Sequence, residues 1–440
     1  MNVKVVKFGG SSLANAEQFQ KVGDIIRSDE SRRYVVPSAP GKRFDEDIKV
    51  TDMLYGCYDA ASKGEDITEK INAIKARYYE IIKGLGLSLS LEEEFKKIDE
   101  DFRAQAGIQY AASRGEFLNG KIMAAYLGYE FIDAAEVIVF DENGNFDGDK
   151  THKILSERLE NTERAVIPGF YGAKPDGSIQ TFSRGGSDIT GSIVAKAVHA
   201  DMYENWTDVS GFLIADPRII KNPKPIDVIT YRELRELSYM GATVLHEDAI
   251  FPVRKEGIPI NIRNTNAPED KGTLIVEDTC RKPRFTITGI AGKKDFASIT
   301  IEKAMMNSEV GFCRKVLEVF ENNNISIEHM PSGIDTMTIF VHQDEFEEHE
   351  QKVLAGIHRA VNPDDIELES DLALIAVVGR GMRQTRGTAG RIFSALAHAH
   401  VNVKMIDQGS SELNIIIGVR EHDFEAAIKA IYDIFVNTQL

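Results

Sequence analysis

The first thirty-six residues read as a strand, a tight turn, a helix and a second strand. Residues 3–6 are strand-like, Lys7-Phe8-Gly9-Gly10-Ser11-Ser12 forms a turn, and residues 34–36 are a second buried apolar run. Between them, apolar residues share one helix face at Phe19, Val22, Ile25 and Ile26. This order predicts two parallel strands with ligands at their carboxyl ends. We therefore expect an α/β domain whose sites open at the turns 9–10 and 38–41.

The first of these turns has the chemistry of a phosphate site. Two consecutive glycines after a strand let the backbone approach a phosphate closely, and Lys7 could reach a phosphoryl group as a point charge. The chain has no Gly-x-Gly-x-x-Gly motif, which disfavours a nicotinamide-type site. Residues 115–121 resemble a P-loop, but no Ser or Thr follows the lysine and the segment lies within a helical pattern.

A second polar turn precedes a helix. Ser183-Arg184-Gly185-Gly186-Ser187-Asp188 leads into residues 189–198, whose apolar positions repeat with the period of one helix face. Unpaired amides and the helix dipole make such a turn a ready anion site. Arg184 adds a clamp for a carboxylate or phosphate, and Asp188 can hold an ammonium. These groups suit a zwitterionic amino acid near a phosphate, although an ordinary capped helix is the alternative.

Composition narrows the class of protein. A chain of 440 residues with 42% hydrophobic and 28% charged residues is typical of a globular protein of two to four domains. No apolar run reaches the roughly 18 residues of a membrane span, and a strand-like start rather than a signal peptide favours the cytoplasm. A net charge of −17, spread along the chain, argues against nucleic acid. Three isolated cysteines predict neither a disulfide framework nor a structural metal.

The rest of the chain consists of segments with different sequence patterns. Residues 51–129 are helical throughout, which suggests an insertion that forms a lid or a dimer surface, and residues 264–284 look like a linker. The tail contains a repeat, because residues 315–341 can be laid without gaps on residues 391–417. Each copy reads strand, helix, strand, strand, helix, so the tail is expected to hold two small α+β modules with a regulatory or binding role.

Taken together, the motifs resemble those of monofunctional aspartate kinases in the amino acid kinase family. The resemblance rests on residues 7–12, 35–41, 113–116, 183–188, 206–209 and 216–218, in order, and on tail modules similar to ACT domains. It implies an α/β fold: a parallel-sheet sandwich catalytic domain, then two α+β, ferredoxin-like ACT domains. The expected limits are 1–283 for the catalytic domain, with the insertion at about 51–130, then 284–369 and 370–440, with an exchange of strands between the modules left open.

The same resemblance implies an activity and its residues. The reaction would be ATP-dependent phosphorylation of the β-carboxylate of L-aspartate, the first step of lysine, threonine and methionine biosynthesis, with Mg²⁺ carried by the nucleotide. Lys7 and Asp188 would be catalytic. Residues that would bind aspartate are Ser38, Thr51, Glu116, Arg184, Ser187 and Asp188. Residues that would bind ATP are Lys7, Gly9, Gly10, Ser11, Thr207, Asp208, Asp216 and Arg218.

One position departs from the family pattern. Many relatives have a lysine between Gly-Ala and Val-Leu-His, whereas this chain has Thr243. A second cation on the nucleotide phosphates is then missing or comes from another residue, for which Lys221 and Lys224 are candidates.

ACT-like modules imply feedback inhibition by an amino acid, lysine first and threonine as the alternative, in a homodimer or homotetramer joined through these modules. The residues expected at the effector site are Met306, Gly311, Phe312, Glu328 and Asp335. Two other functions stay open from the sequence alone. One is another amino acid kinase, for example acting on glutamate, and the other is a non-catalytic amino-acid sensor.

Overall fold

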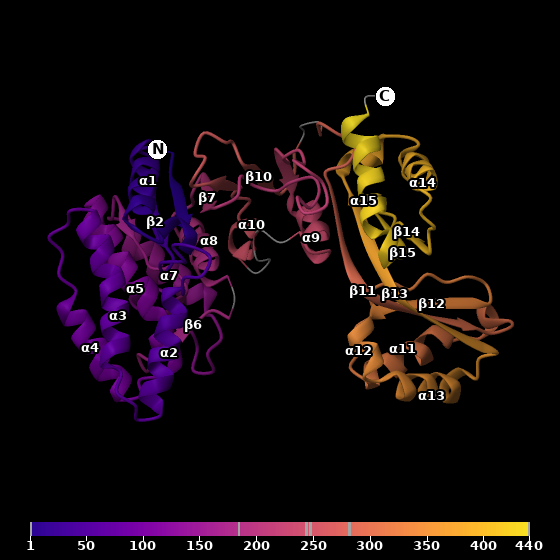
Figure 1. Cartoon of the computed structure of the whole chain (residues 1–440), viewed down its shortest axis with the longest axis horizontal. Coiled ribbons are helices and arrows are strands. Elements are labelled where there is room, and N and C mark those ends of the chain that lie inside the picture. Colours follow the sequence, from indigo (N-terminus) through magenta and orange to yellow (C-terminus); the bar gives the residue numbers. More distant parts are fainter. Residues whose placement is uncertain (1, 184, 243–244, 246–248, 280–282, 439–440) are drawn as a thin grey trace. The chain divides into compact units, whose positions relative to one another are not determined.

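The computed structural model describes residues 2–183, 185–242, 245, 249–279 and 283–438 (Figure 1). The chain forms two compact units. The first comprises Met1–Phe212, Pro225–Tyr231 and Val244–Thr279, and the second comprises Leu213–Lys224, Arg232–Thr243 and Cys280–Leu440.

The first unit is built on an eight-stranded sheet with the strand order β3-β4-β2-β1-β7-β9-β10-β8. All its pairings are parallel except β9 with β10. The central strand β1 is buried over most of its length, as expected for a parallel strand covered on both faces. The bounds of the strands are β1 Lys4–Phe8, β2 Arg32–Pro37, β3 Glu130–Phe131, β4 Ala165–Val166, β7 Met202–Thr207, β8 Val228–Thr230, β9 Ile260–Asn264 and β10 Thr273–Val276.

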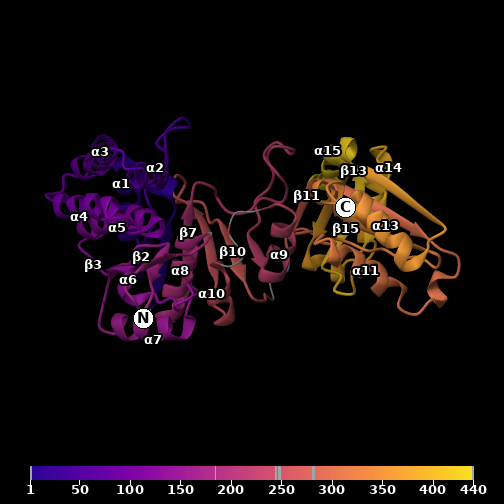
Figure 2. The same ribbon diagram turned by 90° about the horizontal axis from the view of Figure 1, so that it is seen from below.

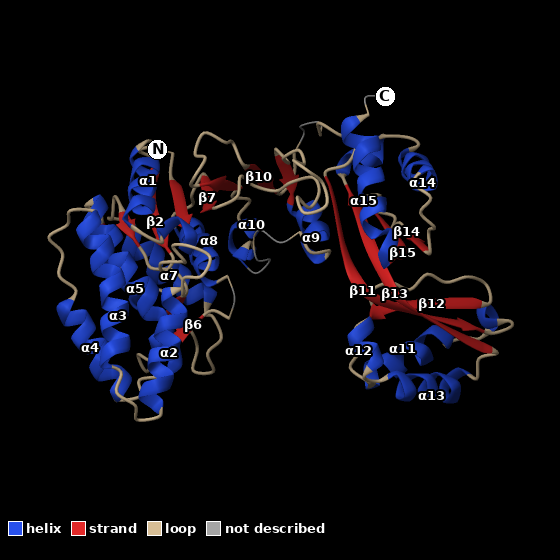
Figure 3. Ribbon diagram, viewed as in Figure 1, coloured by secondary structure: helices blue, strands red, loops and turns tan. Residues whose placement is uncertain are grey.

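Helices cover both faces of this sheet (Figures 2 and 3). Helix α8 packs on β1, β2 and β7, while the core formed with α1 to α5 takes in Phe8 and Trp206. A small hairpin, β5 Tyr171–Ala173 with β6 Ile179–Thr181, lies apart from the main sheet. The bounds of the helices are α1 Ala16–Arg27, α2 Val50–Ser62, α3 Thr68–Gly84, α4 Glu92–Arg103, α5 Ile108–Leu127, α6 Ala134–Val137, α7 Gly148–Leu159, α8 Gly186–Ala197 and α10 Phe251–Lys255.

The expected N-terminal order of strand, turn, helix and parallel strand is confirmed. Two other expectations differ from the structure. Lys7, expected in the turn, lies within β1, and a short 3-10 turn follows at Gly10–Leu13. The expected linker 264–284 was wrong in part, because it contains β10, which pairs with both β8 and β9. Strand pairing overrides the loop-like composition of that segment.

The second unit contains a five-stranded antiparallel sheet with the order β12-β11-β13-β15-β14. Its two long strands, β11 and β13, pair along their whole length and so contribute to both modules. In one half of the sheet, the end of β13 also pairs with β15. In the other half, the end of β11 also pairs with β12. The bounds are β11 Gly289–Glu302, β12 Thr336–His342, β13 Asp365–Val378, β14 Met405–Asp407 and β15 Asn414–Arg420, with helices α9 Tyr231–Tyr239, α11 Phe312–Asn322, α12 Gln343–Glu347, α13 Glu350–Val361, α14 Thr388–His398 and α15 Phe424–Tyr432.

The second module has the predicted order of strand, helix, strand, strand and helix, but the first module departs from it. A second strand is expected between its first helix and its last strand, but the segment between α11 and β12 contains no strand. This segment makes two isolated bridges instead, His329 with Phe340 and Ser332 with Met337. Pro331, which cannot donate to a ladder, lies between these bridges and explains the interruption.

Candidate active site

The site is built around Lys7 on the central strand. Its ammonium lies 2.6 Å from the Oδ1 atom of Asp188, in the first turn of α8. Asn205, the β7 partner of Lys7 in the sheet register, donates its Nδ2 hydrogen to the same oxygen at 2.8 Å. Because side chains alternate along a strand, Lys7 and Asn205 face α8 while Glu204 and Trp206 face the other side. Two strands and a helix thus place one cation and one carboxylate in contact.

Two glycine turns interlock beside Lys7. The Gly9 amide donates to the Trp206 carbonyl at 3.0 Å, and the Gly41 amide donates to the Gly10 carbonyl at 2.8 Å. A Cβ atom on Gly41 would lie 2.6 Å from the carbonyl carbon of Gly10, and one on Gly10 would lie 3.0 Å from the Ala39 oxygen. Only glycine allows this approach of backbone to backbone, so the turn after β1 and the turn after β2 form one rigid edge.

The N-terminus of α8 opens on the same edge. The helix begins at Gly186, three residues earlier than the apolar pattern predicted, because its first turn is held by tertiary contacts. Gly185 precedes it with a left-handed φ of 58° and, as a glycine, has no side chain to cap the helix. Ser187 is buried against Gly169, where a Cβ would lie 2.6 Å away. Uncapped first-turn amides suit an anion. Arg184, the predicted carboxylate clamp, lies outside the described residues.

Glu116 on α5 is a buried carboxylate without a full set of partners. Its side chain is 6% exposed, and its Oε2 atom has no hydrogen-bond partner among the described residues. Burial raises the pKa of Glu116 to about 8, although the backbone amides of Ala39 and Glu116 and the charge of Arg114 act in the opposite direction. A buried carboxyl group with an unused oxygen is suited to receive a cation.

The α5 helix also carries a residue that the sequence reasoning missed. Asn119, one turn after Glu116, donates from Nδ2 to the Ser38 carbonyl at 2.6 Å, and its buried Oδ1 atom has no partner in the part of the chain that the structure describes. Its spacing of three residues from Glu116 was the available signal, since such residues share a helix face. Thr51 lies in the first turn of α2, with its Oγ1 atom 3.9 Å from the position that a Cβ of Gly115 would take.

The remaining predicted nucleotide residues divide between the two units. Thr207 ends β7 and its hydroxyl contacts the Asp208 carboxylate at 3.2 Å, while Ser11 is exposed in the turn after β1. Asp216 and Arg218 belong to the second unit, where they pair with each other at 2.6 Å. Lys221 and Lys224 belong to that unit too, and Thr243 lies outside the described residues. The edge of β1, β2 and β7 therefore brings together most of the site, but the nucleotide role of Asp216 and Arg218 stays a prediction.

The second unit has a cavity of about 300 Å³ at the turn before α11. Three of the residues expected at the effector site, Met306, Gly311 and Phe312, line it, together with Glu309, Cys313 and Arg314 among others. Hydrogen bonds from Lys303 and Lys315 lower the pKa of Glu309 to about 2.

Neither of the two acidic residues expected at this site is among the residues that line the cavity. Glu328 is bound by the Tyr239 hydroxyl at 2.7 Å. Asp335 accepts the Met305 amide at 2.9 Å, so it shapes the turn that the cavity adjoins.

The described residues contain neither a cluster of metal ligands nor a membrane-spanning helix. Within residues 2–183, 185–242, 245, 249–279 and 283–438, no group of three or more His, Cys, Asp or Glu side chains is arranged to hold a metal ion. No helix in the described part of the chain is long and apolar enough to cross a membrane.

Comparisons with known proteins identify the family. The model of the amino acid kinase family matches residues 2–264, and an ACT domain model matches residues 375–435. Aspartokinase 3 of Bacillus subtilis is 40% identical, over 98% of this chain and 98% of its own. The crystal structure of Clostridium acetobutylicum aspartate kinase, described as an allosteric enzyme, matches with a TM-score of 0.90 and 52% identity, over 99% of this chain and 100% of that one.

Escherichia coli aspartokinase III, solved with aspartate and ADP, has the same fold at a TM-score of 0.71 and 24% identity, over 98% of this chain and 99% of that one. The full-length match to aspartokinases, the two-domain family pattern and the geometry of the Lys7 edge agree. This chain belongs to the amino acid kinase family and is an aspartokinase with a C-terminal ACT region.

Proposed function

We propose that this aspartokinase transfers the γ-phosphoryl group of ATP to the β-carboxylate of L-aspartate at the edge formed by β1, β2 and β7. The product is 4-phospho-L-aspartate, and the reaction is the first step of lysine, threonine and methionine biosynthesis. The observation that carries the proposal is the ion pair of Lys7 with Asp188, 2.6 Å long, beside the Gly9-Gly10 turn.

The chemistry requires charge stabilisation more than proton transfer. A β-carboxylate with a reference pKa of about 3.9 is ionised at neutral pH, so no general base is needed. Two anions must instead be brought together and the charge on the moving phosphoryl group stabilised. Lys7 has three N–H donors, of which Asp188 receives one, so the ammonium is oriented with donors left for phosphoryl oxygens.

Aspartate binds between α5 and α8 in this proposal. Glu116, with its unpaired oxygen, and Asp188 hold the ammonium group. Arg184 holds a carboxylate, and Ser38, Thr51 and Ser187 supply neutral hydrogen bonds. The choice of a free amino acid follows from the two carboxylates, since an N-acylated substrate would offer them no positive charge.

ATP binds at the glycine turn. The closeness of Gly10 and Gly41 leaves bare backbone at this edge, which suits a phosphate, and the residues that hold the nucleotide are Lys7, Gly9, Gly10, Ser11, Thr207, Asp208, Asp216 and Arg218. Mg²⁺ enters with the nucleotide and neutralises charge on its phosphate oxygens.

An end-product amino acid inhibits the enzyme through the ACT region. A relative from Escherichia coli, 26% identical over 98% of this chain, is named a lysine-sensitive aspartokinase, and lysine is our first candidate, with threonine second. The cavity lined by Met306, Gly311 and Phe312 is the proposed site. Asp335, which holds the Met305 turn, and Glu328 are the acidic residues proposed to take part in effector binding. The enzyme works in the cytoplasm as a homodimer or homotetramer joined through its ACT domains.

A coupled assay of ADP release tests the proposal. Aspartate should support ADP release with ATP and Mg²⁺, glutamate should not, and millimolar lysine or threonine should lower the rate. Lys7→Ala should lower kcat by at least about 100-fold while the apparent KM for aspartate changes little. Lys21→Ala, which removes an exposed lysine on α1, is the matched control.

The outcomes separate the competing functions. A normal kcat in Lys7→Ala would refute the assigned role of this lysine. ADP release with glutamate alone would indicate a different amino acid kinase, and no release with any amino acid would indicate a sensor. The comparisons with aspartokinases favour neither alternative.

A further inference from the structure

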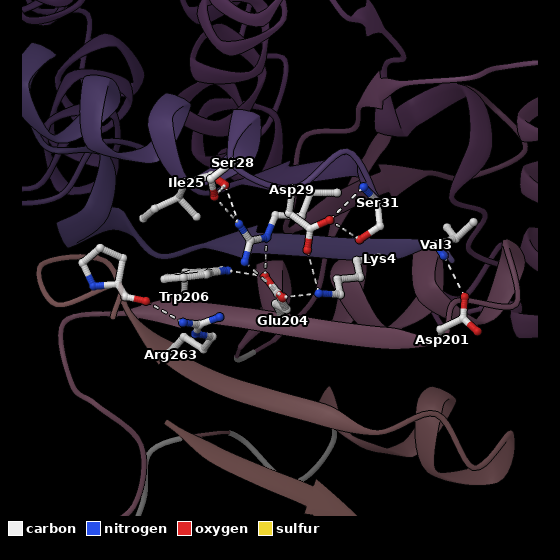
Figure 4. A network of polar contacts seen from close by, with 12 residues as sticks. Val3, Lys4, Ile25, Ser28, Asp29, Ser31, Asp201, Glu204, Trp206 and Arg263 are labelled. Atoms are coloured by element: carbon white, nitrogen blue, oxygen red, sulfur yellow. Dashed lines mark hydrogen bonds and ion pairs between the residues drawn. The ribbon is translucent and has the colours of Figure 1, made fainter. Parts of the chain in front are cut away.

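A buried ionic group lies on the face of the sheet opposite Lys7. We call Lys4, Arg32, Glu204, Trp206 and Arg263 the Glu204 cluster (Figure 4). The Glu204 side chain is 1% exposed. Its carboxylate accepts hydrogen bonds from Arg32 Nε at 2.8 Å and from Trp206 Nε1 at 2.9 Å. It also forms an ion pair with Lys4, whose Nζ atom lies 3.4 Å away. Since Arg32, Lys4 and Glu204 lie on β2, β1 and β7, one carboxylate ties together three adjacent strands of the sheet.

Two cations of the cluster, Arg32 and Lys4, also bind residues outside it. Arg32 donates from Nη1 to the Ile25 carbonyl and to the Ser28 hydroxyl at 3.0 Å, at the end of α1. Lys4 donates to Asp29 at 2.8 Å. With Asp29 included, three cations face two carboxylates, and each contact is made to a specific partner. Removal of the Glu204 charge would leave a buried guanidinium without its counter-ion, which is more harmful than loss of a whole pair.

Trp206 connects this cluster to the glycine turn. Its indole N–H is held by Glu204, and its ring lies parallel to Phe8, with centroids 5.9 Å apart and planes inclined by 19°. The guanidinium of Arg263 is 4.6 Å from the ring centroid. The carbonyl of Trp206 accepts the Gly9 amide at 3.0 Å, and Thr207 and Asp208 follow directly in the chain. A shift of the indole would therefore move both the turn and the start of the following loop.

Arg263 supports that loop from the neighbouring strand β9. Its Nη2 atom donates to the carbonyls of Pro268 and Asp270. The Asp270 carboxylate accepts the Ser210 hydroxyl at 2.6 Å, and Asn264 donates to the same hydroxyl at 3.1 Å. The start of the loop after β7 is thus flanked by two fixed residues, Trp206 and Ser210, and the groups that hold them contact Arg263 or lie next to it.

We infer that Glu204 is a positioning residue for nucleotide binding. It touches no substrate and acts through Trp206 on the Gly9 turn and on the Thr207–Asp208 segment. Because Trp206 is the only tryptophan in the chain, its fluorescence should report occupation of this edge by a nucleotide. The inference rests on the proposed function, which places the nucleotide at these residues. A cluster that only stabilises the fold would instead leave nucleotide affinity unchanged.

Glu204→Gln in the full-length enzyme tests the inference. Glutamine keeps the shape and an acceptor for the indole N–H, but it removes the charge that holds Arg32 and Lys4. The apparent KM for ATP should rise about tenfold, which corresponds to the middle of the range of coupling energies between residues in direct contact. The KM for aspartate should stay within about twofold of the wild-type value. The change in tryptophan fluorescence on addition of MgADP should shrink.

Asp29→Asn is the matched control, because it removes one negative charge from a partner of Lys4 that has no contact with Trp206. It should keep the wild-type KM for ATP and the wild-type fluorescence response. A Glu204→Gln enzyme with a lower Tm but an unchanged KM for ATP and an unchanged fluorescence response would overturn the positioning role.

Trp206→Phe covers the case in which Glu204→Gln does not fold. It keeps an aromatic ring beside Phe8 but removes the N–H donated to Glu204 together with part of the indole ring, so calorimetry should show weaker MgADP binding by several-fold. Unchanged MgADP binding in this variant would also overturn the inference. In contrast, a wild-type enzyme whose fluorescence does not respond to saturating MgADP would refute the proposed nucleotide site itself.

Discussion

Replacement of Glu116 by glutamine would separate the contribution of this carboxylate to substrate binding from its effect on the fold. Glu116 is buried, its Oε2 atom has no partner within the described residues, and desolvation raises its pKa from 4.5 to about 8. At pH 7 only about a tenth of the free enzyme would then carry the ionised group. An ammonium group needs the ionised form, so aspartate binding should release a proton and depend on pH.

The dependence can be calculated from the pKa. With a pKa of about 8, the ionised fraction rises about ninefold from pH 6 to pH 7 and about fivefold from pH 7 to pH 8. The value of kcat/KM for aspartate should rise by the same factors, because only the ionised enzyme binds the ammonium. Glu116→Gln should lower kcat/KM at pH 8 and remove the rise. The ADP-release assay at subsaturating aspartate measures both effects.

The same pKa predicts a change in stability of the opposite sign. The folded pKa lies above the unfolded one, so the folded state binds the extra proton between pH 4.5 and about 8. The free energy of unfolding of the wild type should therefore fall as pH rises through this window, by about 5 kcal/mol in total. Glu116→Gln lacks this loss, so the variant should gain stability relative to the wild type from pH 5 to pH 8 in urea unfolding without substrate.

Glu93→Gln, which changes an exposed glutamate on α4, is the control and should keep both wild-type profiles. A Glu116→Gln enzyme whose kcat/KM still rises in parallel with the wild type would contradict the ammonium role. A stability difference that stays constant from pH 5 to pH 8 would contradict the raised pKa.

Three further substitutions test the glycine edge, its support and the effector cavity. Gly41→Ala should lower kcat/KM about 100-fold, because the new Cβ atom would push the Gly10 backbone away. Gly56→Ala, whose Cβ meets nothing within 4 Å, should keep the wild-type activity. Equal activities of the two variants would refute the close fit of the glycine turns. Arg77→Met should lower the free energy of unfolding, measured in urea, by about 3–5 kcal/mol, because it leaves Asp47 and the Gly41 carbonyl without this buried donor. An unchanged urea midpoint would contradict the supporting role of Arg77. Gly311→Asp should raise the lysine concentration for half inhibition about tenfold, since Gly311 has a φ of +83° at the cavity, and an unaltered value would exclude this turn.

The sequence alone predicted the parts of the fold that depend on local patterns. The apolar run of β1, the helical period of α1 and the buried run of β2 are properties of short windows, and they predicted parallel pairing correctly. The motif at 183–188 was also readable, but the helix start was wrong by three residues. Polar residues in the first turn of α8 are held by partners far away in the chain, such as Lys7 at Asp188, which no local period reveals.

The site itself was readable as residue types but not as contacts. The motifs indicated Lys7, Glu116 and Asp188, yet nothing in a linear pattern showed that Asn205 shares Asp188 with Lys7. Nor could composition show that one oxygen of Glu116 is left unpaired. These facts depend on burial and on which strands are neighbours.

Only the tertiary structure decided how the polar groups are paired. The strand order β2-β1-β7 brings Arg32, Lys4 and Glu204 together on one face and places Lys7 beside Asn205 on the other, although about 170 residues of chain separate β2 from β7. It also turned a loop-like segment into β10 by pairing it with β8 and β9. The physical reason is that apolar periodicity records which side chains leave water, whereas a buried charge is tolerated only where distant elements supply its partner.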